Sequence, residues 1–216
     1  MERTIKVSGI GKISLKPDVT IISVDCRNKC ASYKEAMDSA SNEVRIFQDA
    51  IEKAGVGVDS LKTTEFKIDL CQKNVRDEKG NYYKKYDGYE YYQSLVIRFD
   101  TDNRTLGKVL FHLSKTSLNN VEYDVRFGVK DTEKAKDMLL AEAIKDAKKK
   151  ASIIAKEAGV TLGEIIDIQY CWNQVTFEPS RNMLFCVNRS KDFINYHFNP
   201  DDITEKDTVT LVYEIK

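Results

Sequence analysis

Apolar and polar residues alternate along much of the chain, and each alternating run predicts a β-strand with one buried face. About seven such runs occur, at residues 5–15, 22–26, 66–70, 91–99, 121–129, 166–172 and 209–215. Between 72 and 88 the pattern gives way to a charged, tyrosine-rich stretch with Gly80-Asn81 at its middle, which predicts a hairpin tip.

Three segments have apolar residues at helical spacing instead. Ser32 and Glu35 form a capping box before the first helix, and Asp102 caps a short second one. The third helix is expected from Thr132 to Ala158, with a sheet-facing stripe of alanines that also includes Ile154.

Strands with one buried face are typical of antiparallel sheets. We therefore expect an α+β fold, an antiparallel sheet of about seven strands with about three helices packed on one side. No linker composition divides the chain. Residues 1–216 are thus expected to form a single domain, with a divergent loop insertion at about 173–205.

The first run contains the pair Gly9-Ile10-Gly11. A dinucleotide-binding loop needs a third glycine and a following helix, whereas here strand-like residues and Pro17 follow. Glycine inside a strand pattern more often marks a bulge or a close backbone approach, which is the interpretation we favour.

Six of the eleven tyrosines lie between residues 82 and 92, with lysines and arginines interleaved. This composition is compatible with an aromatic platform for single-stranded nucleic acid, but nearby acids leave little net charge, so no nucleic acid is expected. Strand or interface packing is the interpretation we favour.

The segment from Asn173 to Asp202 has no clear periodicity but many apolar residues. It either folds over the domain's own core, or packs on another subunit, or covers a ligand. Together with the tyrosine hairpin it supplies the candidate interaction surface: Tyr82, Tyr83, Tyr86, Met183, Phe185, Phe193, Tyr196 and Phe198.

Basic and acidic residues balance at 34 each, which argues against a dedicated nucleic-acid binder. No apolar run is long enough to span a membrane, and no secretory leader opens the sequence, so a cytoplasmic location is expected unless a leader was trimmed. Five scattered cysteines predict reduced thiols, with Cys26 and Cys30 buried on one strand face.

The two histidines, His112 and His197, have no partners at metal-ligand or triad spacing. The sequence therefore predicts no catalytic residues, no metal site and no cofactor, and the protein is not expected to be an enzyme.

Five stretches in order, VSGIGKISLKPDVTIISVDC, AGVGVDSLKTTEF, GYEYYQSLVIRFDTDNRTLGKVL, AEAIKDAKKKASIIAKEAGVTLGEIIDI and KDTVTLVYEI, resemble the SIMPL (DUF541) family. The resemblance covers nearly the whole chain except about 173–204 and implies an antiparallel sheet with packed helices. It also implies kinase association in the member that names the family, ring-like or channel-like assemblies in some envelope members, and oxidative-stress tolerance in others.

The resemblance and the lack of catalytic groups together favour a non-enzymatic protein of uncharacterised function, one that acts through self-assembly or a protein partner. A role in stress is implied by the resemblance only. The alternative is a small-ligand-binding protein or enzyme with a pocket under the 173–205 loop.

Overall fold

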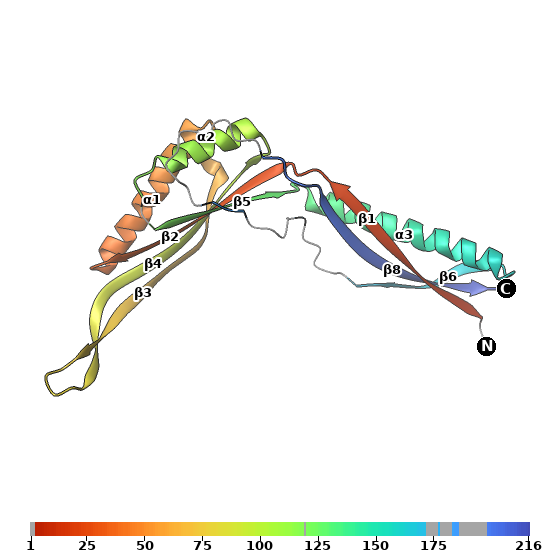
Figure 1. Ribbon diagram of the computed structural model, residues 1–216. Helices are drawn as coiled ribbons and strands as arrows, with labels where there is room; N and C mark the ends of the chain where they lie inside the picture. Colours follow the sequence, from red (N-terminus) through yellow and green to blue (C-terminus); the bar gives the residue numbers. More distant parts are fainter. Residues whose placement is uncertain (1–2, 119, 172–176, 178–182, 186–197) are drawn as a thin grey trace. The chain divides into compact units, whose positions relative to one another are not determined.

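The computed structural model describes residues 3–118, 120–171, 177, 183–185 and 198–216, with the backbone alone at 183–185. The described residues fold into two compact units, shown in Figure 1. One combines the start, a middle segment and the end of the chain, and the other is built mainly from Asp18–Phe127.

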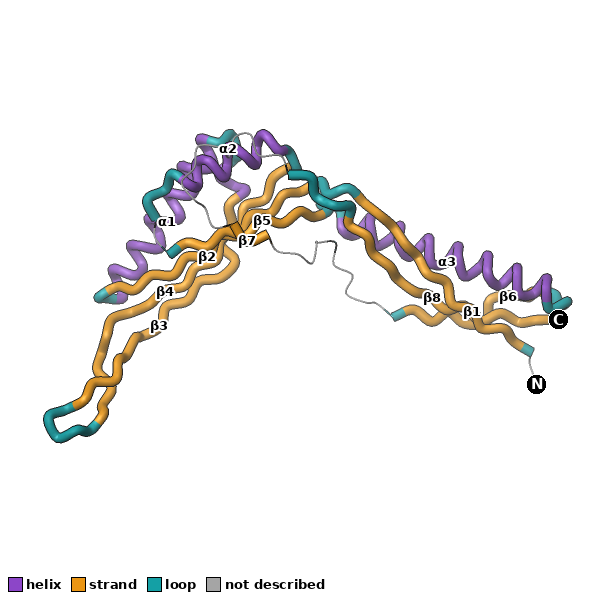
Figure 2. The backbone as a smooth tube through the Cα atoms, viewed as in Figure 1, coloured by secondary structure: helices purple, strands orange, loops and turns teal. Residues whose placement is uncertain are grey.

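The first unit is a three-stranded antiparallel sheet with one helix on it. Its strand order is β1 (Thr4–Leu15), β8 (Ile203–Ile215) and β6 (Leu162–Tyr170), and β8 lies in the middle (Figure 2). Helix α3 (Thr132–Glu157) buries its alanine stripe against apolar residues of β1 and β8. Asp131 caps this helix by accepting a hydrogen bond from the backbone N–H of Lys134 at 2.9 Å.

Gly9 and Gly11 let α3 approach β1 closely, as the sequence predicts. A Cβ atom at Gly9 would lie 2.6 Å from the Ala147 Cβ, and closer still to backbone atoms of Ala143 and Ala147. A Cβ at Gly11 would lie 2.9 Å from the backbone nitrogen of Ala143. The pair is thus a helix-packing surface within a strand and not a phosphate loop.

Side chains of α3 also cover the outer edge of β1. The backbone N–H of Ile10 donates to Asp146 Oδ2 at 2.8 Å, and Lys150 Nζ donates to the Ser8 carbonyl at 3.4 Å. Asp146 and Lys150 are themselves paired at 2.7 Å. Groups that would otherwise recruit another strand are satisfied within the unit.

The second unit is a five-stranded sheet with two helices on one face (Figure 1). The strand order is β3 (Leu61–Arg76), β4 (Tyr82–Asp100), β2 (Val19–Cys30), β5 (Val121–Gly128) and β7 (Met183–Phe185). Helices α1 (Tyr33–Lys53) and α2 (Asn103–Ser114) enclose its core, and the short 3-10 turn Val58–Ser60 precedes β3.

Local capping explains where α1 and α2 begin. The Ser32 side chain accepts a hydrogen bond from the Glu35 N–H, and Glu35 reaches back to the Ala31 N–H at 2.9 Å. Asp102 accepts from the Thr105 N–H at 2.7 Å. Both caps confirm the sequence predictions.

The α+β class and the approximate number of elements are confirmed, but the strands divide between two sheets rather than forming one. β1 and β2 follow each other in the chain yet pair with β8 and β4, not with each other. The expected inward position of Ile154 is wrong, because its side chain is 45% exposed near the end of α3.

Candidate functional site

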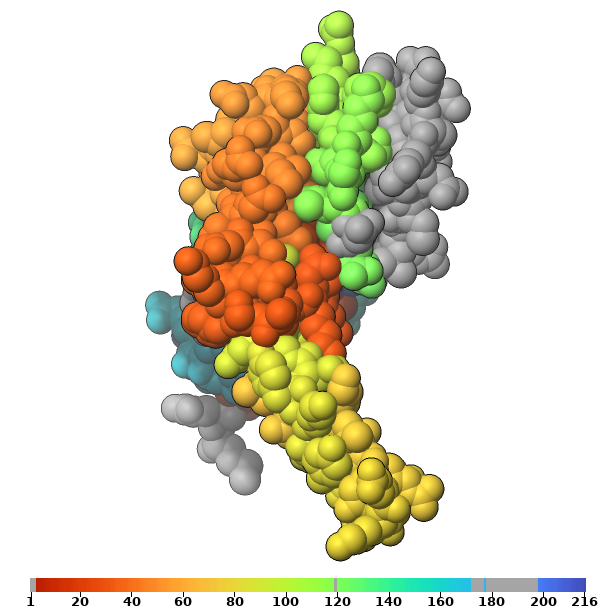
Figure 3. Space-filling model, turned by 90° about the vertical axis from the view of Figure 1, so that its left-hand side faces the viewer, coloured from red at the N-terminus to blue at the C-terminus, as the bar shows by residue number. Residues whose placement is uncertain are grey.

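The β3–β4 hairpin continues beyond the rest of its sheet. β2 ends at Cys30, which pairs with Tyr89, so residues 72–86 form a two-stranded ribbon that no third strand of the described residues joins. We call residues 72–86 the arm; it is yellow in Figure 3, standing clear of the β2 and α1 region. Tyr82, Tyr83 and Tyr86 are 74%, 49% and 51% exposed.

The tip of the arm is held in one conformation by Asp77. Its carboxylate accepts hydrogen bonds from the N–H groups of Lys79 at 2.9 Å and Asn81 at 2.8 Å, and from the Asn81 side chain at 3.2 Å. These bonds, led by the one from the Asn81 backbone, hold the pKa of Asp77 below its ordinary value. The Arg76 guanidinium lies 5.8 Å from the Tyr82 ring centre, which orders the first tyrosine of the tip.

The base of the arm is joined to the sheet by charge and by close backbone packing. Asp87 pairs with Lys29 of β2 and with Lys73 of β3, and the two ammonium groups lower its pKa. Gly88 has φ +94° and passes so close to the Cys30 carbonyl that a Cβ would collide with it. The Tyr86 hydroxyl donates to the Ala31 carbonyl, so this tyrosine is anchored while its ring stays half exposed.

A buried carboxyl group lies between α1 and the sheet. Glu43 is 4% exposed, its Oε1 accepts from the Asn28 amide at 2.7 Å, and the Cys26 thiol and Tyr91 hydroxyl border the same group. Burial raises the pKa of Glu43 and of Cys26. A thiol held in its protonated form is a poor nucleophile, so this cluster supports the core rather than covalent chemistry. The helical spacing of apolar residues did not predict that Glu43 is buried, because it assigns every charged residue to the exposed face of the helix.

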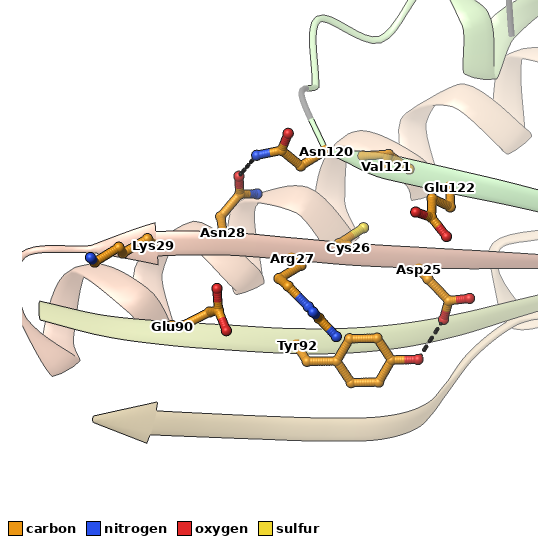
Figure 4. Close-up of a pocket in the computed structure, with 10 residues that line it drawn as sticks. All are labelled: Asp25, Cys26, Arg27, Asn28, Lys29, Glu90, Tyr92, Asn120, Val121 and Glu122. Carbon is orange, nitrogen blue, oxygen red and sulfur yellow. Dashed lines mark hydrogen bonds between the residues drawn. The ribbon is translucent and has the colours of Figure 1, made fainter. Parts of the chain in front are cut away.

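One hollow of the second unit lies along β2, beside β4 and the start of β5 (Figure 4). It has a volume of about 490 Å³ and is lined from β2, β4 and the start of β5. Tyr92 donates to Asp25 at 2.9 Å and carries the Arg27 guanidinium 5.6 Å from its ring centre. Asp25, Tyr92 and Arg27 thus contact one another within the hollow, as polar side chains do on a sheet surface that faces water.

The histidine and the cysteines give no catalytic arrangement in the described part of the chain. His112 lies in a shallow hollow between α1 and α2, where burial and then Lys115 and Lys53 lower its pKa. Cys26 and Cys30 are buried as predicted, and Cys71 and Cys171 are also free thiols. Within the described residues no three His, Cys, Asp or Glu side chains are grouped to hold a metal ion.

Of the predicted interaction residues, Tyr82, Tyr83, Tyr86 and Phe198 have described side chains. Met183 and Phe185 belong to β7, which pairs with β5, and their side chains are not described. Phe198 is 7% exposed, and its ring lies 6.2 Å from that of Phe127. At this position the segment from Asn173 to Asp202 therefore packs on the core of the second unit. Phe193, Tyr196, His197 and most of the expected 173–205 loop lie outside the described residues, although β8 already begins at Ile203.

A family model described as "SIMPL: Protein of unknown function (DUF541)" matches residues 5–213. The chain belongs to the SIMPL family. The matched range of this SIMPL chain covers both units apart from the first and last few residues.

Curated relatives of this SIMPL chain include the "26 kDa periplasmic immunogenic protein" of Brucella melitensis biotype 1 and the protein of the same name from Brucella abortus. Each is 26% identical over 164 residues, which cover 76% of this chain and 65% of the relative. The cytoplasmic location expected from the sequence is contradicted, since these relatives are named as periplasmic proteins. None of the described helices is both long and apolar enough to cross a bilayer.

Proposed function

We propose that this SIMPL protein is a non-enzymatic assembly protein of the cell envelope that works through protein contacts, with the arm as a docking element. The envelope location is carried over from the periplasmic relatives. The observation that carries the assembly proposal is the arm, a ribbon whose three tyrosines are 49–74% exposed and which has no third strand among the described residues.

Two-stranded ribbons are at best marginally stable in water by themselves. This arm is nevertheless ordered at its tip by Asp77 and tied at its base by Asp87. An ordered tyrosine-bearing hairpin loses little conformational entropy when it docks, because its rings are already positioned. Tyrosine also suits a surface that is exposed to water in the free protein and buried in a complex, because its ring is apolar and its hydroxyl group is polar.

The first test is the native mass of the full chain by light scattering on a sizing column, in reducing buffer at moderate salt. We expect a discrete oligomer. The double variant Tyr82→Ser/Tyr83→Ser should weaken it, because truncating central interface tyrosines typically costs more than about 1 kcal/mol each.

Met138→Ser is the matched control, since it removes another exposed apolar side chain, 46% exposed on α3. Assembly unchanged by the tyrosine variant would remove the arm from the proposal. A wild-type chain that stays monomeric at every concentration tested would overturn self-assembly altogether.

A further inference from the structure

Within the part of the chain that the structure describes, the outer edge of β3 is an open strand edge in the five-stranded sheet. Among these strands β3 pairs with β4 alone, and it ends the strand order. Its residues 65–70 form a regular run that pairs with residues 94–89 of β4, bounded by register shifts at Thr63/Glu65 and Leu70/Gln72. An open, regular edge of this kind is a template for another strand.

Apolar side chains lie exposed along one face of this run. Phe66 and Leu70 are 42% and 52% exposed. They share a face with Ile68, which pairs with Tyr91 beneath α1. Helix α1 packs on β2 and β4 but leaves the Phe66 and Leu70 side chains exposed.

Alternating charges occupy the opposite face of the same run. Lys67 and Asp69 pair with each other at 2.7 Å and are 62% and 58% exposed. Lysines on an edge strand usually discourage pairing with other chains. Here Lys67 is followed two residues later by an acid, so a suitable register satisfies both charges.

Symmetry restricts the registers that two copies of β3 can adopt. A two-fold axis relating adjacent antiparallel strands runs perpendicular to the sheet, so opposed residues lie on the same face. The axis must then lie midway between the two copies of one residue, which are opposite each other across the interface. Placed at Lys67 or at Asp69 it sets like charges opposite each other, and placed at Phe66 it aligns only three residues of the regular run.

With the axis at Ile68, residues 66–70 of the two copies pair without a bulge. Lys67 of each copy then lies opposite Asp69 of the other copy, so two pairs of opposite charges cross the interface. On the other face, Phe66 lies opposite Leu70 of the second copy. Cross-strand pairs of opposite charge and of aromatic with aliphatic residues are the stabilising unit of antiparallel sheets.

We infer that β3 pairs with β3 of a second copy, antiparallel about a two-fold axis at Ile68, to make one continuous ten-stranded sheet from the two five-stranded sheets. The inference rests on the proposed assembly function and names its partner and its register. The arm gains support as well, since residues beyond Leu70 in one copy run beside the start of β3 in the other.

The other edges of the described strands are less suited to this contact. α3 side chains occupy the edge of β1, and β7 has three residues. β6 exposes Ile165, Ile166 and Ile168, but two register shifts within its nine residues leave a short regular run.

Charge exchange tests the register directly. Lys67→Glu places a second carboxylate opposite Asp69, and Asp69→Lys places a second ammonium group opposite Lys67, so each single variant should weaken self-association about tenfold. An equal mixture of the two single variants restores opposite charges across the interface and should form a heterodimer. The double variant Lys67→Glu/Asp69→Lys should self-associate like the wild type.

Sedimentation velocity of each variant, and native mass spectrometry of the mixture, give the readout. Lys108→Glu, on the exposed surface of α2, is the control for the change in net charge. Rescue in the mixture and in the double variant supports the inference, even if one single variant folds poorly. An oligomer that persists in both single variants would overturn the β3 register while leaving the assembly proposal standing, and a monomeric wild type would overturn both.

Discussion

Replacing Gly9 by alanine should loosen the packing of α3 on β1. The added Cβ would lie 2.6 Å from the Ala147 Cβ, whereas ordinary contacts begin at 3.4 Å. The helix and the strand must therefore separate locally by at least this difference, about 0.8 Å, or the backbone must distort. Backbone atoms of Ala143 and Ala147 stand in the same place, and they cannot rotate away as a side chain can.

A gap of this size forfeits a quarter to a half of the dispersion energy of each contact that it opens. The contacts at stake are those of the alanine stripe with Val7, Val209 and Leu211, all buried. Overpacking of a tight core costs about 1–3 kcal/mol, and the immovable backbone neighbours place Gly9→Ala at the upper end. We expect a loss of about 3 kcal/mol, roughly a hundredfold in the folding equilibrium of the first unit.

Urea denaturation followed by circular dichroism measures this loss. With a slope of about 2 kcal/mol per molar, the midpoint of the α3-containing unit should fall by about 1.5 M. Gly57→Ala is the control, because a Cβ there meets nothing within 4 Å and φ is −64°. It should stay within about 0.5 kcal/mol of the wild type. If Gly9→Ala did the same, the close-approach interpretation of the glycine pair would be refuted.

Three further predictions concern the second unit. Burial raises the pKa of Glu43 above its ordinary 4.5, so its favourable contribution is complete below that pH and is lost as pH rises through the folded-state pKa. The unfolding free energy of the wild type should therefore fall between pH 4.5 and the folded-state pKa of Glu43, by about 1.4 kcal/mol for each pH unit of that interval. Glu43→Gln should remove this fall, and an unchanged slope in a series of denaturation curves at different pH would contradict the prediction. Asp102→Ala removes the cap of α2 and should cost about 1 kcal/mol in urea denaturation, with Asp102→Asn close to wild type; equal loss in both would argue against capping. Asp77→Ala should speed amide hydrogen exchange at Asn81 about tenfold without changing global stability, and unaltered exchange would show that the tip is held by other contacts.

Local features of the fold were predictable from the sequence. The caps at Ser32 and Asp102 and the hairpin tip near Gly80 depend on residues within a few positions of one another. The hydrogen bonds that form these features join residues close in sequence, so a pattern of a few residues is enough to predict them.

Pairing partners and buried polar groups were not predictable in this way. β1 pairs with β8 at a separation of about two hundred residues, and alternation shows only which face of each strand is buried. Glu43 of α1 lies inside because Asn28 of β2 donates a hydrogen bond to its carboxyl group. The alternating pattern predicts that Phe66 and Leu70 are core residues, yet they lie half exposed because α1 stops short of the sheet edge.

The middle position of β8 in the three-stranded sheet has a consequence for how the chain matures. Neither β1 nor β6 has a partner until the last strand is made, whereas Asp18–Phe127, which forms most of the second unit, is complete far earlier. At about 5–20 residues per second, β1 waits on the order of ten seconds or more for β8 during synthesis. Throughout that time the unpaired backbone groups of β1 can form hydrogen bonds with other strands. Premature termination before Ile203 would likewise leave the first unit without its central strand, while the segment that builds the second would already be present.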